Sequence, residues 1–449
     1  MDAHGPANAG ASIGARDEPT RNSRALTAFR RKTCAVQAKP SALGAARSLL
    51  GSTAMTRLPT SSTELLVVGA GPVGLFSALC AARRGVEVLV LDQSWQGFGR
   101  GYATILHPRS LKLLEEEGVG EELLRAGRPI EAISLFVDKS KVTTLELPAP
   151  ALAIAQSTLE EALLGALQGH GIRPHAPYQA TTIEQNGSGA NVRVMRRELV
   201  RLGSPADYSD WEPVESSMIH ADFVIGADGY ESRVRAALGI DSVTVGSTES
   251  FSIFEFATSS TVDDIELSFE SELTSAMIPL PNGRVRWSFQ LNSELDRTPD
   301  LAQLQSLLAE RAPWYSDGTS VIDWSTVMHF ERRLARSFGE GRVWLAGDAA
   351  HVTNPFGGQS VNGGLFEAHD LASRMAACSK GRAGLDTLEH YGRERRREWH
   401  KLLGVNVQFE LLANAQPWLV PYARRILPAL PASGHDLDQR LAQIGLRVH

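Results

Sequence analysis

The order of apolar and polar residues predicts a strand–helix–strand unit near residue 60. Residues 65–68 form a short apolar run, whose length and β-branched content are typical of a buried parallel strand. Apolar residues then recur at helical spacing over residues 75–82, and Gly85 ends the predicted helix. Residues 86–91 form a second apolar strand. This order is typical of an α/β fold with a parallel sheet.

A buried strand that ends at a polar break occurs twice more. Residues 223–225 precede Asp228-Gly229 and a predicted helix, and residues 343–346 precede Gly347-Asp348. Other predicted elements are helices at 108–117 and 156–168, a β-rich segment at 134–147 and paired strands within 178–220. After the Gly347-Asp348 stretch, the pattern is mostly helical to the end of the chain.

Residues 251–292 alternate in the manner of an antiparallel sheet. Pro281-Asn282-Gly283 between two such runs predicts a hairpin turn. Because side chains alternate across a strand, the run RVRWSFQL has two distinct faces. One face carries Val285, Trp287, Phe289 and Leu291, and the other carries Arg286, Ser288 and Gln290.

Composition narrows the class of protein. The chain has 449 residues, of which 43% are hydrophobic, and this is enough for a large core and two or three domains. A net charge of −6 without a dominant basic face argues against a nucleic-acid partner. No apolar run is long enough for a transmembrane span. The three cysteines are far apart and form no metal-binding or disulfide pattern, which favours a reducing, cytoplasmic location.

Residues 1–60 differ from the rest, because they are rich in Ala, Ser, Gly and Arg and keep no helical or strand period. We expect a disordered tail there. Its arginines leave organelle targeting open, although Asp2, Asp17 and Glu18 argue against it. A third alternative is that the functional chain begins at Met55.

The segment Gly69-Ala70-Gly71-Pro72-Val73-Gly74 lies between the first predicted strand and helix, and this is the context that a dinucleotide-binding Gly-x-Gly-x-x-Gly motif requires. Asp92 ends the second strand, 23 residues after Gly69, near the position of a ribose-binding carboxylate. The glycines allow a tight turn and close approach of a pyrophosphate to the helix N-terminus. The motif alone leaves both FAD and NAD(P) open, and a ligand-free turn is the structural alternative.

The stretch VWLAGDAAHVTNPFGGQSVNGG combines a buried strand, one carboxylate and many glycines. A packed core would use larger side chains, whereas glycines let backbone N–H groups approach a ligand closely. Taken separately, Asp348 could cap a helix and Asp228 could stabilise a turn. Two such aspartates, each after a buried strand, favour a ligand site. His351 is interpreted as a local hydrogen-bonding residue.

These three motifs, in this order, resemble the FAD-dependent aromatic hydroxylases, the flavoprotein monooxygenases with the p-hydroxybenzoate hydroxylase fold. The resemblance runs from about Thr63 to about Met375. It implies a Rossmann-like FAD-binding domain interleaved with a mixed β-sheet substrate domain, and a helical C-terminus. Asn354, Ser360, Tyr102 and the segment GLFEAHDL depart from the usual pattern of the family.

The resemblance also assigns roles. Asp92 would bind the adenosine ribose, Gln156 the ribityl region, and Asp348 a ribityl hydroxyl. Asp228, with Gly229, would lie near the pyrophosphate and take part in binding NAD(P)H. The catalytic assignments are Pro355 against the flavin ring and Gly357 and Gly358 in the turn after it. Cofactor contacts are further expected at Gly347, Gly358, Ser360, Val361 and Asn362, where helix N–H groups would face flavin N1 and stabilise its charge by ~0.3–2 kcal/mol.

The implied activity is NAD(P)H-dependent hydroxylation of an aromatic or polyketide-like small molecule with O2, through a flavin C4a-hydroperoxide. Met277, Trp287 and Phe289 are candidate walls of the substrate pocket, with ordinary core packing as the alternative for each. Other reactions on the same motifs would be epoxidation, reduction or halogenation, although the WxWxIP signature of halogenases is missing. A non-catalytic FAD-binding protein is a further alternative, and a plain NAD dehydrogenase would not need the two later aspartate motifs.

The domain boundaries predicted on this basis are as follows. The FAD-binding domain comprises residues 61–130, 150–245 and 335–392, and the substrate domain comprises 131–149 and 246–334. Residues 393–449 form a C-terminal helical segment, expected to pack on the main body or in a homodimer rather than on a membrane surface.

Overall fold

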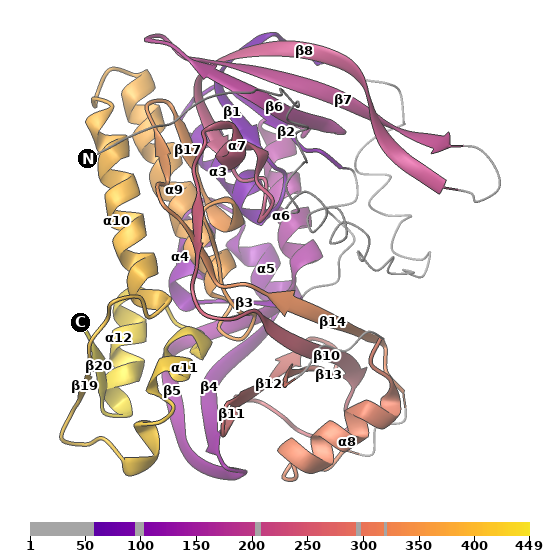
Figure 1. Ribbon diagram of the computed structural model, residues 1–449, viewed down its shortest axis with the longest axis vertical. Coiled ribbons are helices and arrows are strands. Elements are labelled where there is room, and N and C mark those ends of the chain that lie inside the picture. Colours follow the sequence, from indigo (N-terminus) through magenta and orange to yellow (C-terminus); the bar gives the residue numbers. More distant parts are fainter. Residues whose placement is uncertain (1–57, 95–102, 203–207, 293–297, 318–320) are drawn as a thin grey trace, which may run out of the picture. The chain divides into compact units, whose positions relative to one another are not determined.

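The structure is a computed structural model that describes residues 58–94, 103–202, 208–292, 298–317 and 321–449 (Figure 1). The predicted tail and the departure at Tyr102 therefore lie outside the described residues, apart from 58–60. The described residues, from Leu58 onward, form one compact unit. The finer division into FAD-binding and substrate domains stays a prediction, and its boundary at residue 393 falls inside helix α10 (Asp386–Leu402).

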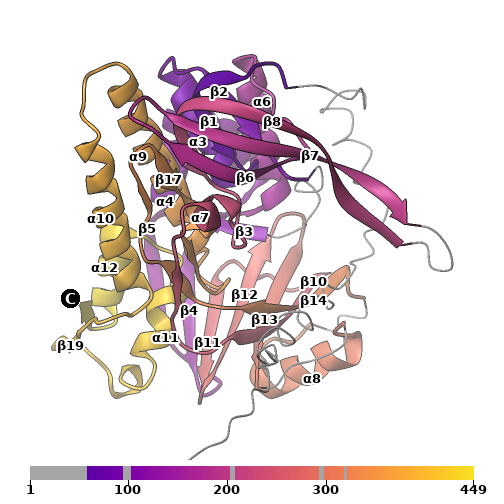
Figure 2. The same cartoon turned by 45° about the horizontal axis from the view of Figure 1, so that its top comes forward.

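The first sheet carries the nucleotide-type motifs. Its parallel part has the order β17 (Val343–Leu345), β8 (Tyr208–Gly226), β1 (Ser62–Val68), β2 (Val88–Leu91). An antiparallel strand, β16 (Gly339–Glu340), pairs with β17 at the edge. The antiparallel strands β6 (Tyr178–Gln185) and β7 (Ala190–Leu202) continue from β8 as a long ribbon (Figure 2). The apolar runs predicted as buried parallel strands are confirmed.

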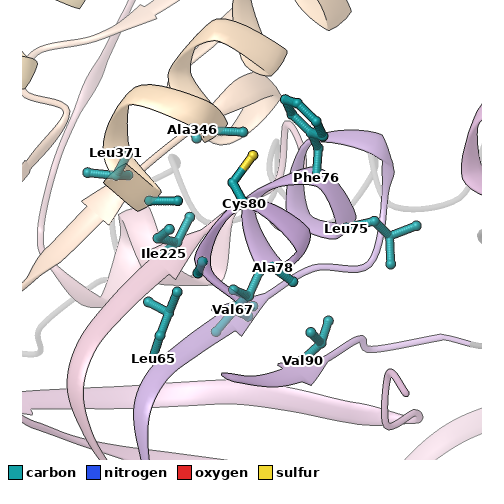
Figure 3. Close-up of a cluster of buried hydrophobic side chains, with 14 of the residues drawn as sticks. Leu65, Val67, Leu75, Phe76, Ala78, Cys80, Val90, Ile225, Ala346 and Leu371 are labelled. Carbon is teal, nitrogen blue, oxygen red and sulfur yellow. The ribbon is translucent and has the colours of Figure 1, made fainter. Parts of the chain in front are cut away.

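Helices α3 (Pro72–Arg83) and α9 (Gln359–Ser379) pack against each other beside this sheet, and α6 (Gln156–Gly169) packs on α3. Figure 3 shows part of the core beside these helices, to which β1 contributes Leu65 and Val67, and α3 contributes Leu75 and Ala78. Three short helices accompany them: α4 (Pro108–Glu116), α5 (Gly120–Ala126) and α7 (Arg233–Ala237). The small residues along α3 let it lie close to the strands.

The second sheet has eight strands in the order β14-β10-β13-β12-β11-β4-β5-β3. Their bounds are β3 (Ala103–Leu106), β4 (Arg128–Val137), β5 (Ser140–Ala155), β10 (Glu249–Ala257), β11 (Ile265–Glu270), β12 (Leu273–Leu280), β13 (Arg284–Leu291) and β14 (Trp324–Phe330). The predicted hairpin connects β12 to β13, where Asn282 and Gly283 both have positive φ. The mixed fold class predicted from the sequence is confirmed.

The two faces of this sheet have different neighbours. Phe254, Phe256 and Trp287 pack toward α8 (Leu301–Arg311), whereas Phe251, Ile253 and Ile278 share a cluster with the C-terminal segment. That segment contains α11 (Ala423–Ala429), α12 (Gly434–Gln443) and a ribbon of β19 (Phe409–Leu411) and β20 (Leu446–Val448). It is therefore less purely helical than predicted, and its apolar side chains are buried against the sheet. Among the described residues, no helix is long and apolar enough to cross a membrane.

A small third sheet leads toward the glycine-rich stretch. It has the order β18 (His351–Val352), β15 (Arg333–Ala335), β9 (Ser242–Thr244). A 3-10 turn at Gly347–Ala349 separates β17 from β18.

Candidate functional site

The Gly-x-Gly-x-x-Gly loop joins β1 to α3, and each glycine has a different steric reason. A Cβ on Gly69 would lie 2.1 Å from the carbonyl oxygen of Ala227, and one on Gly74 would lie 2.0 Å from the carbonyl oxygen of Gly69. These two glycines are required by packing. Around Gly71, by contrast, no atom of the described residues lies within 4 Å of an added Cβ. The space beside Gly71 is therefore open to a ligand, next to the N-terminus of α3.

The three motif loops meet at the carboxyl ends of neighbouring strands. Gly69 contacts Ala227, the residue before Asp228, and a Cβ on Gly347 would lie 3.0 Å from Cγ2 of Val73. Since β1, β8 and β17 are adjacent and parallel, their ends bring these loops together. The residues that the sequence analysis selected from separate segments thus surround one region.

Asp92 lies at the end of β2 and faces this loop. Its Oδ2 accepts a hydrogen bond of 2.7 Å from the backbone N–H of Ala70, and its Oδ1 accepts one from Ser94. Desolvation raises the pKa of Asp92 above its ordinary value, while these two N–H donors act in the opposite direction. The carboxylate therefore holds the glycine loop in shape, and ribose binding by Asp92 stays a prediction.

Gln156 begins α6, and its Nε2 donates a 2.8 Å hydrogen bond to Oε1 of Glu160. Glu160 is buried, and the sequence analysis did not select it. Burial raises the pKa of Glu160 to about 7, with a smaller contribution from the nearby Asp92 carboxylate. A glutamate at the fifth position of an amphipathic helix carries no sequence signal that would have distinguished it from a solvent-exposed one.

Asp228 stabilises the local turn, which is the structural alternative to ligand binding. Its Oδ2 accepts hydrogen bonds from the backbone N–H groups of Arg233 and Val234, and its Oδ1 accepts one from the hydroxyl of Ser232. It therefore holds the N-terminus of α7. The next residue, Gly229, has a φ of +81°, and an added Cβ there would meet no described atom within 4 Å. Contacts of Asp228 with a pyrophosphate or with NAD(P)H stay predictions.

Asp348 is exposed, whereas Gly347 and Ala349 on either side are buried. Its side chain caps no helix turn, so the capping alternative does not describe it. The surrounding protein raises the pKa of Asp348, chiefly by limiting its hydration, and the positive potential of His351 opposes this. Asp348 is thus a carboxylate that solvent reaches between two buried residues.

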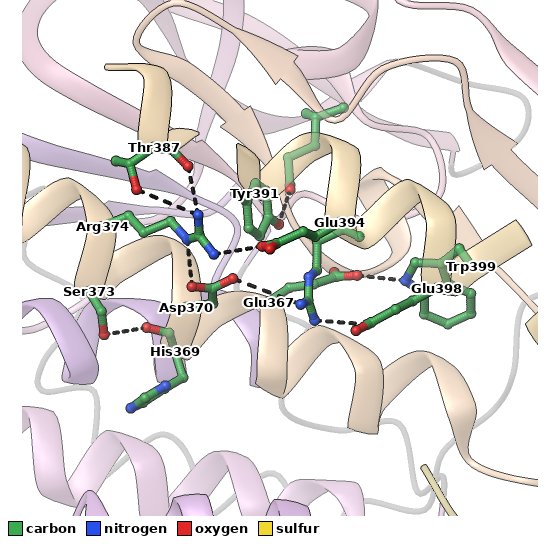
Figure 4. A network of polar contacts seen from close by, with 12 residues as sticks. Glu367, His369, Asp370, Ser373, Arg374, Thr387, Tyr391, Glu394, Glu398 and Trp399 are labelled. Atoms are coloured by element: carbon green, nitrogen blue, oxygen red, sulfur yellow. Dashed lines mark hydrogen bonds and ion pairs between the residues drawn. The ribbon is translucent and has the colours of Figure 1, made fainter. Parts of the chain in front are cut away.

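Behind Asp348 lies a buried polar cluster between α9 and α10. Oε2 of Glu367 accepts from the backbone N–H of Gly347 at 2.7 Å and lies 2.8 Å from Nε2 of His351. Its Oε1 accepts from Nε1 of Trp399 at 2.6 Å, and the Glu367–Trp399 contact is drawn in Figure 4. The His351 ring stacks on Trp399 with centroids 3.5 Å apart. His351 therefore has the local hydrogen-bonding role expected of it.

The turn before α9 presents backbone to the region in front of Asp348. Gly358 adopts the left-handed conformation with φ +61°, and no described side chain caps the helix that follows. An added Cβ on Gly358 would lie 2.9 Å from the carbonyl oxygen of Ile105. The buried Oγ of Ser360 lies near Asp348 and opposes the rise in the pKa of that carboxyl. The first N–H groups of α9, up to Val361, thus begin a helix with positive partial charge and no side-chain cap.

Asn362 and His107 hold this turn. Asn362 donates from Nδ2 to the carbonyl oxygens of Ile105 and Gly358, and its Oδ1 accepts from the backbone N–H of His107. Nε2 of His107 lies 2.7 Å from the carbonyl oxygen of Gly357 and is therefore the protonated ring nitrogen. Burial lowers the pKa of His107 to about 4. Asn362 is thus a positioning residue by its side chain, and its predicted cofactor contact stays a prediction.

The C-terminal segment also holds the turn before α9 in place. Nε2 of Gln359 donates to the carbonyl oxygens of Leu430 and Ala432 at 2.7 and 3.0 Å. A Cβ on Gly357 would lie 2.5 Å from the carbonyl oxygen of Pro428. Gly357 is therefore a glycine because of close packing against this segment. His107 and residues 428–432 are far from this turn along the chain, so no local sequence pattern connects them with the site.

A small cavity of about 40 Å³ lies between this turn and the second sheet. Its lining includes Pro355, Phe356 and Gly358 from the turn, and Ile278, Arg286 and Ser288 from the sheet. Arg286 is buried and paired with Glu255. The predicted walls Met277, Trp287 and Phe289 are fully buried in the cluster that contains α8 residues. These three side chains therefore match the alternative of ordinary core packing. Side chains alternate along β13, so Arg286 and Ser288 point toward the cavity and Trp287 and Phe289 point away from it.

These observations fit an FAD dinucleotide. Open space beside Gly71 and Gly229, the exposed carboxylate of Asp348 and the uncapped start of α9 lie at one edge of a parallel sheet. Backbone N–H groups and a single carboxylate are suited to a pyrophosphate, a polyol chain and a ring that gains negative charge on reduction. The described residues contain no cluster of potential metal ligands.

Comparison with known proteins identifies the family to which this chain belongs. The model of the family described as "FAD binding domain" matches residues 62–404. Together with the fold and the three motif loops, this shows that the chain belongs to the family of FAD-dependent aromatic hydroxylases with the p-hydroxybenzoate hydroxylase fold.

Among individual relatives, aklavinone 12-hydroxylase of Streptomyces purpurascens is 28% identical, covering 74% of this chain and 65% of that protein. The 6-methylpretetramide 4-monooxygenase of Streptomyces rimosus is 27% identical, covering 74% of this chain and 59% of that protein. The chain thus spans between 59% and 65% of the length of these curated relatives.

Solved structures share the fold. The p-nitrophenol 4-monooxygenase of Pseudomonas putida DLL-E4 has a TM-score of 0.67 at 19% identity, over 86% of this chain and 94% of that one. An aklavinone-11 hydroxylase, solved with FAD and aklavinone, has a TM-score of 0.63 at 25% identity, over 85% of this chain and 73% of that one.

Proposed function

We propose that this protein is an NAD(P)H-dependent FAD monooxygenase that hydroxylates an aromatic or polyketide-like small molecule. The observation that carries the proposal is the cavity between the uncapped start of α9 and the second sheet. The names of the relatives, which include hydroxylases of aklavinone and of 6-methylpretetramide, support a polycyclic aromatic substrate class.

Bound FAD would supply the redox chemistry, by taking a hydride from NAD(P)H and activating O2 for transfer of one oxygen atom to the substrate ring. The resemblance to the family implies how bound FAD would transfer oxygen to the substrate, and the proposal includes that reaction. The protein's own residues bind, orient and exclude water. Gly71 and the N-terminus of α3 would admit the pyrophosphate, and Asp348 would accept hydrogen bonds from the ribityl chain.

The turn at Pro355–Gly358 would lie against the flavin ring. Its backbone is held from two sides, because Asn362 and His107 bind the carbonyl oxygens of Gly358 and Gly357. Gln359 fixes the first residue of α9 to the C-terminal segment. Donors held this firmly need little reorganisation when charge develops, and this is the condition under which backbone dipoles contribute most to catalysis.

The substrate would occupy the cavity. Ile278 and Phe356 offer apolar surface for a ring, and Ser288 offers a hydroxyl for a polar substituent. At about 40 Å³ the cavity is smaller than sites that hold drug-sized molecules, which are typically ~300–1,000 Å³. Productive binding therefore requires the lining side chains or the turn to move outward.

The proposal is tested by reconstitution. The purified full chain is incubated with FAD, and its absorption spectrum, its oxidation of NADH and NADPH, and incorporation of labelled O2 into a panel of phenols and polycyclic phenols are measured. Tight FAD binding, substrate-stimulated NAD(P)H oxidation and label in the product are expected. Bound FAD that NAD(P)H does not bleach would reduce the assignment to a non-catalytic flavoprotein, and failure to bind FAD would overturn it.

The oligomeric state and the cellular location of the protein are the remaining parts of the proposal. The C-terminal segment packs on the second sheet of the same chain, and the alternative of a homodimer is checked by light scattering of the FAD-loaded protein. A cytoplasmic location is expected and is checked by fractionation of the cells that produce it.

A further inference from the structure

A second and larger cleft lies away from the motif loops. It has a volume of about 390 Å³ and lies between helix α10 and the edge of the first sheet near β16 and β17. Its lining contains Arg336, Phe338, Trp344, Arg393, Arg396 and Arg397, with Ser337, Glu389, Gly392 and His400. None of these residues belongs to the loops of the candidate flavin site. We refer to it as the arginine cleft.

Helical spacing places the basic residues of α10 on one face. Arg393, Arg396, Arg397 and His400 follow the i, i+3, i+4, i+7 pattern of a single helix face. Arg336 comes from the opposite wall, before β16. The four arginines are exposed. Guanidinium groups thus face the cleft from two separate elements.

The charges on this face of α10 differ from those on the face toward α9. On the α9 side, Arg374 pairs with Glu394 at 2.7 Å, and Arg395 pairs with Glu398 at 2.9 Å (Figure 4). Within the part of the chain that the structure describes, none of the four cleft arginines has an ion pair. Of the four arginines in RERRREW, Arg395 is therefore neutralised by an ion pair, whereas Arg393, Arg396 and Arg397 are not, within the described residues.

The cleft has an excess of positive charge. Glu389 is the one acidic residue in its lining, so four arginines and one glutamate leave three positive charges. Burial, with a smaller effect of the neighbouring Arg396, lowers the pKa of His400, so its ring adds less positive charge to the cleft than a free imidazole would. A concave site with this charge concentrates anions, and the planar guanidinium fork matches the oxygens of phosphate.

The floor of the cleft is aromatic. Trp344 and Phe338 are almost fully buried beneath it. Helix α10 approaches Trp344 closely at Gly392, where an added Cβ would lie 2.7 Å from the indole ring. Trp344 and Phe338 thus shape the base of the cleft but offer almost no surface for stacking, so the exposed arginines are the groups that a ligand would contact.

We propose that the arginine cleft binds a small molecule that carries more than one phosphate group, with its phosphates on Arg336, Arg393, Arg396 and Arg397. The volume favours this ligand, because ~300–1,000 Å³ is typical of small-molecule sites, whereas an acidic peptide needs a longer basic track. The inference is independent of the proposed oxygenase activity.

The test uses the full chain saturated with FAD, so that added nucleotide cannot occupy the dinucleotide site. Binding of ATP, pyrophosphate, inorganic phosphate and an oligoglutamate peptide is measured by calorimetry at low and high salt. Saturable binding of ATP and of pyrophosphate, stronger than that of inorganic phosphate and weakened by salt, is expected. Tighter binding of the peptide, or no binding of ATP, would overturn the proposal.

Matched variants locate the site. Arg396→Ala/Arg397→Ala is expected to weaken ATP binding at least tenfold, with flavin absorbance and melting temperature unchanged, because both side chains are exposed. Arg173→Ala/Arg193→Ala removes two exposed arginines outside the cleft and should leave ATP binding unchanged. Arg396→Lys/Arg397→Lys keeps the charge but not the fork, so intermediate affinity is expected. Equal ATP affinity of the two alanine variants would contradict the proposal.

Discussion

Nε2 of His351 lies 2.8 Å from Oε2 of Glu367, and both side chains are almost completely withdrawn from solvent. The same carboxylate accepts the backbone N–H of Gly347, the residue that leads into Asp348. Glu367 thus connects α9 to the end of β17 and to Trp399 of α10. A buried carboxylate with three donors positions the loop on which Asp348 lies, without contacting the open side of the site itself.

The first prediction concerns this carboxylate. Glu367→Gln keeps the size but offers one acceptor oxygen, so at least one of the buried donors at Gly347, His351 and Trp399 loses its partner. We expect a loss of about 1–3 kcal/mol in the free energy of unfolding, as for other buried donors left without a partner. Urea unfolding of the FAD-free protein at pH 7 measures it.

The control is Glu398→Gln, which removes an exposed glutamate paired with Arg395. Exposed pairs contribute little, so a loss of no more than about 1 kcal/mol is expected. If both variants lost the same stability, Glu367 would not have the positioning role argued above.

The second prediction separates glycines required by packing from glycines required by a ligand. Gly71 has an ordinary extended backbone with φ −76°, and its missing Cβ would meet no described atom within 4 Å. Gly71→Ala is therefore expected to keep or slightly raise stability, by up to ~1 kcal/mol. Its methyl group would occupy the space proposed for the pyrophosphate, so FAD affinity should fall at least ~10-fold.

Gly74→Ala is the counterpart, since its Cβ would lie 2.0 Å from the carbonyl oxygen of Gly69. We expect a loss of stability of about 1–3 kcal/mol or more from this overpacking. Thermal melts and titration with FAD, followed by quenching of flavin fluorescence, measure both variants. A stable Gly71→Ala protein with unchanged FAD affinity would refute the proposed position of the pyrophosphate.

The third prediction follows from Glu160, whose pKa is raised by burial from 4.5 to about 7. The folded protein therefore holds this proton more tightly than the unfolded chain. The contribution of Glu160 is present below pH 4.5 and is lost as the pH rises to about 7, a loss on the order of 3 kcal/mol. Glu160→Gln should remove this pH dependence.

His107 acts in the opposite direction over nearly the same range. Its pKa falls from 6.5 to about 4, so its protonation destabilises the folded protein as the pH falls from 6.5 to 4. Unfolding of the FAD-free protein between pH 4 and 8 should therefore show a steeper rise of stability with pH in Glu160→Gln than in the wild type. Identical pH profiles of the two proteins would contradict the raised pKa of Glu160.

The fourth prediction tests which face of the second sheet meets the substrate. Ile278 lines the cavity, whereas Phe289 lies in the cluster that contains α8 residues. Ile278→Ala should enlarge the cavity, at a loss of about 2–5 kcal/mol, and shift the preference of NAD(P)H oxidation toward bulkier phenols. Phe289→Ala should lose about 3–5 kcal/mol and leave that preference unchanged. If only Phe289→Ala changed the preference among phenols, the substrate would have to bind on the face of the second sheet that carries Phe289.

Features that depend on neighbouring residues in the chain could be predicted from the amino-acid sequence. A glycine turn after a buried strand is required by local sterics, so the order of residues was enough to locate the loops at Gly69, Asp228 and Gly347. The two faces of RVRWSFQL followed from the alternation of a strand, and the hairpin at Asn282-Gly283 followed from the preference of these residues for positive φ.

Contacts between distant residues needed the three-dimensional arrangement. Periodicity shows that a strand has two faces but not which one meets a cavity, so Trp287 and Phe289 were selected while Arg286 and Ser288 line it. The burial of Glu160 and the bond from His107 to Gly357 depend on packing between segments. Local sequence thus specifies where the backbone can approach a dinucleotide, because that is a steric property of a few adjacent residues. Which side chains support the site follows from the folded chain alone, because burial and hydrogen bonding depend on residues hundreds of positions apart.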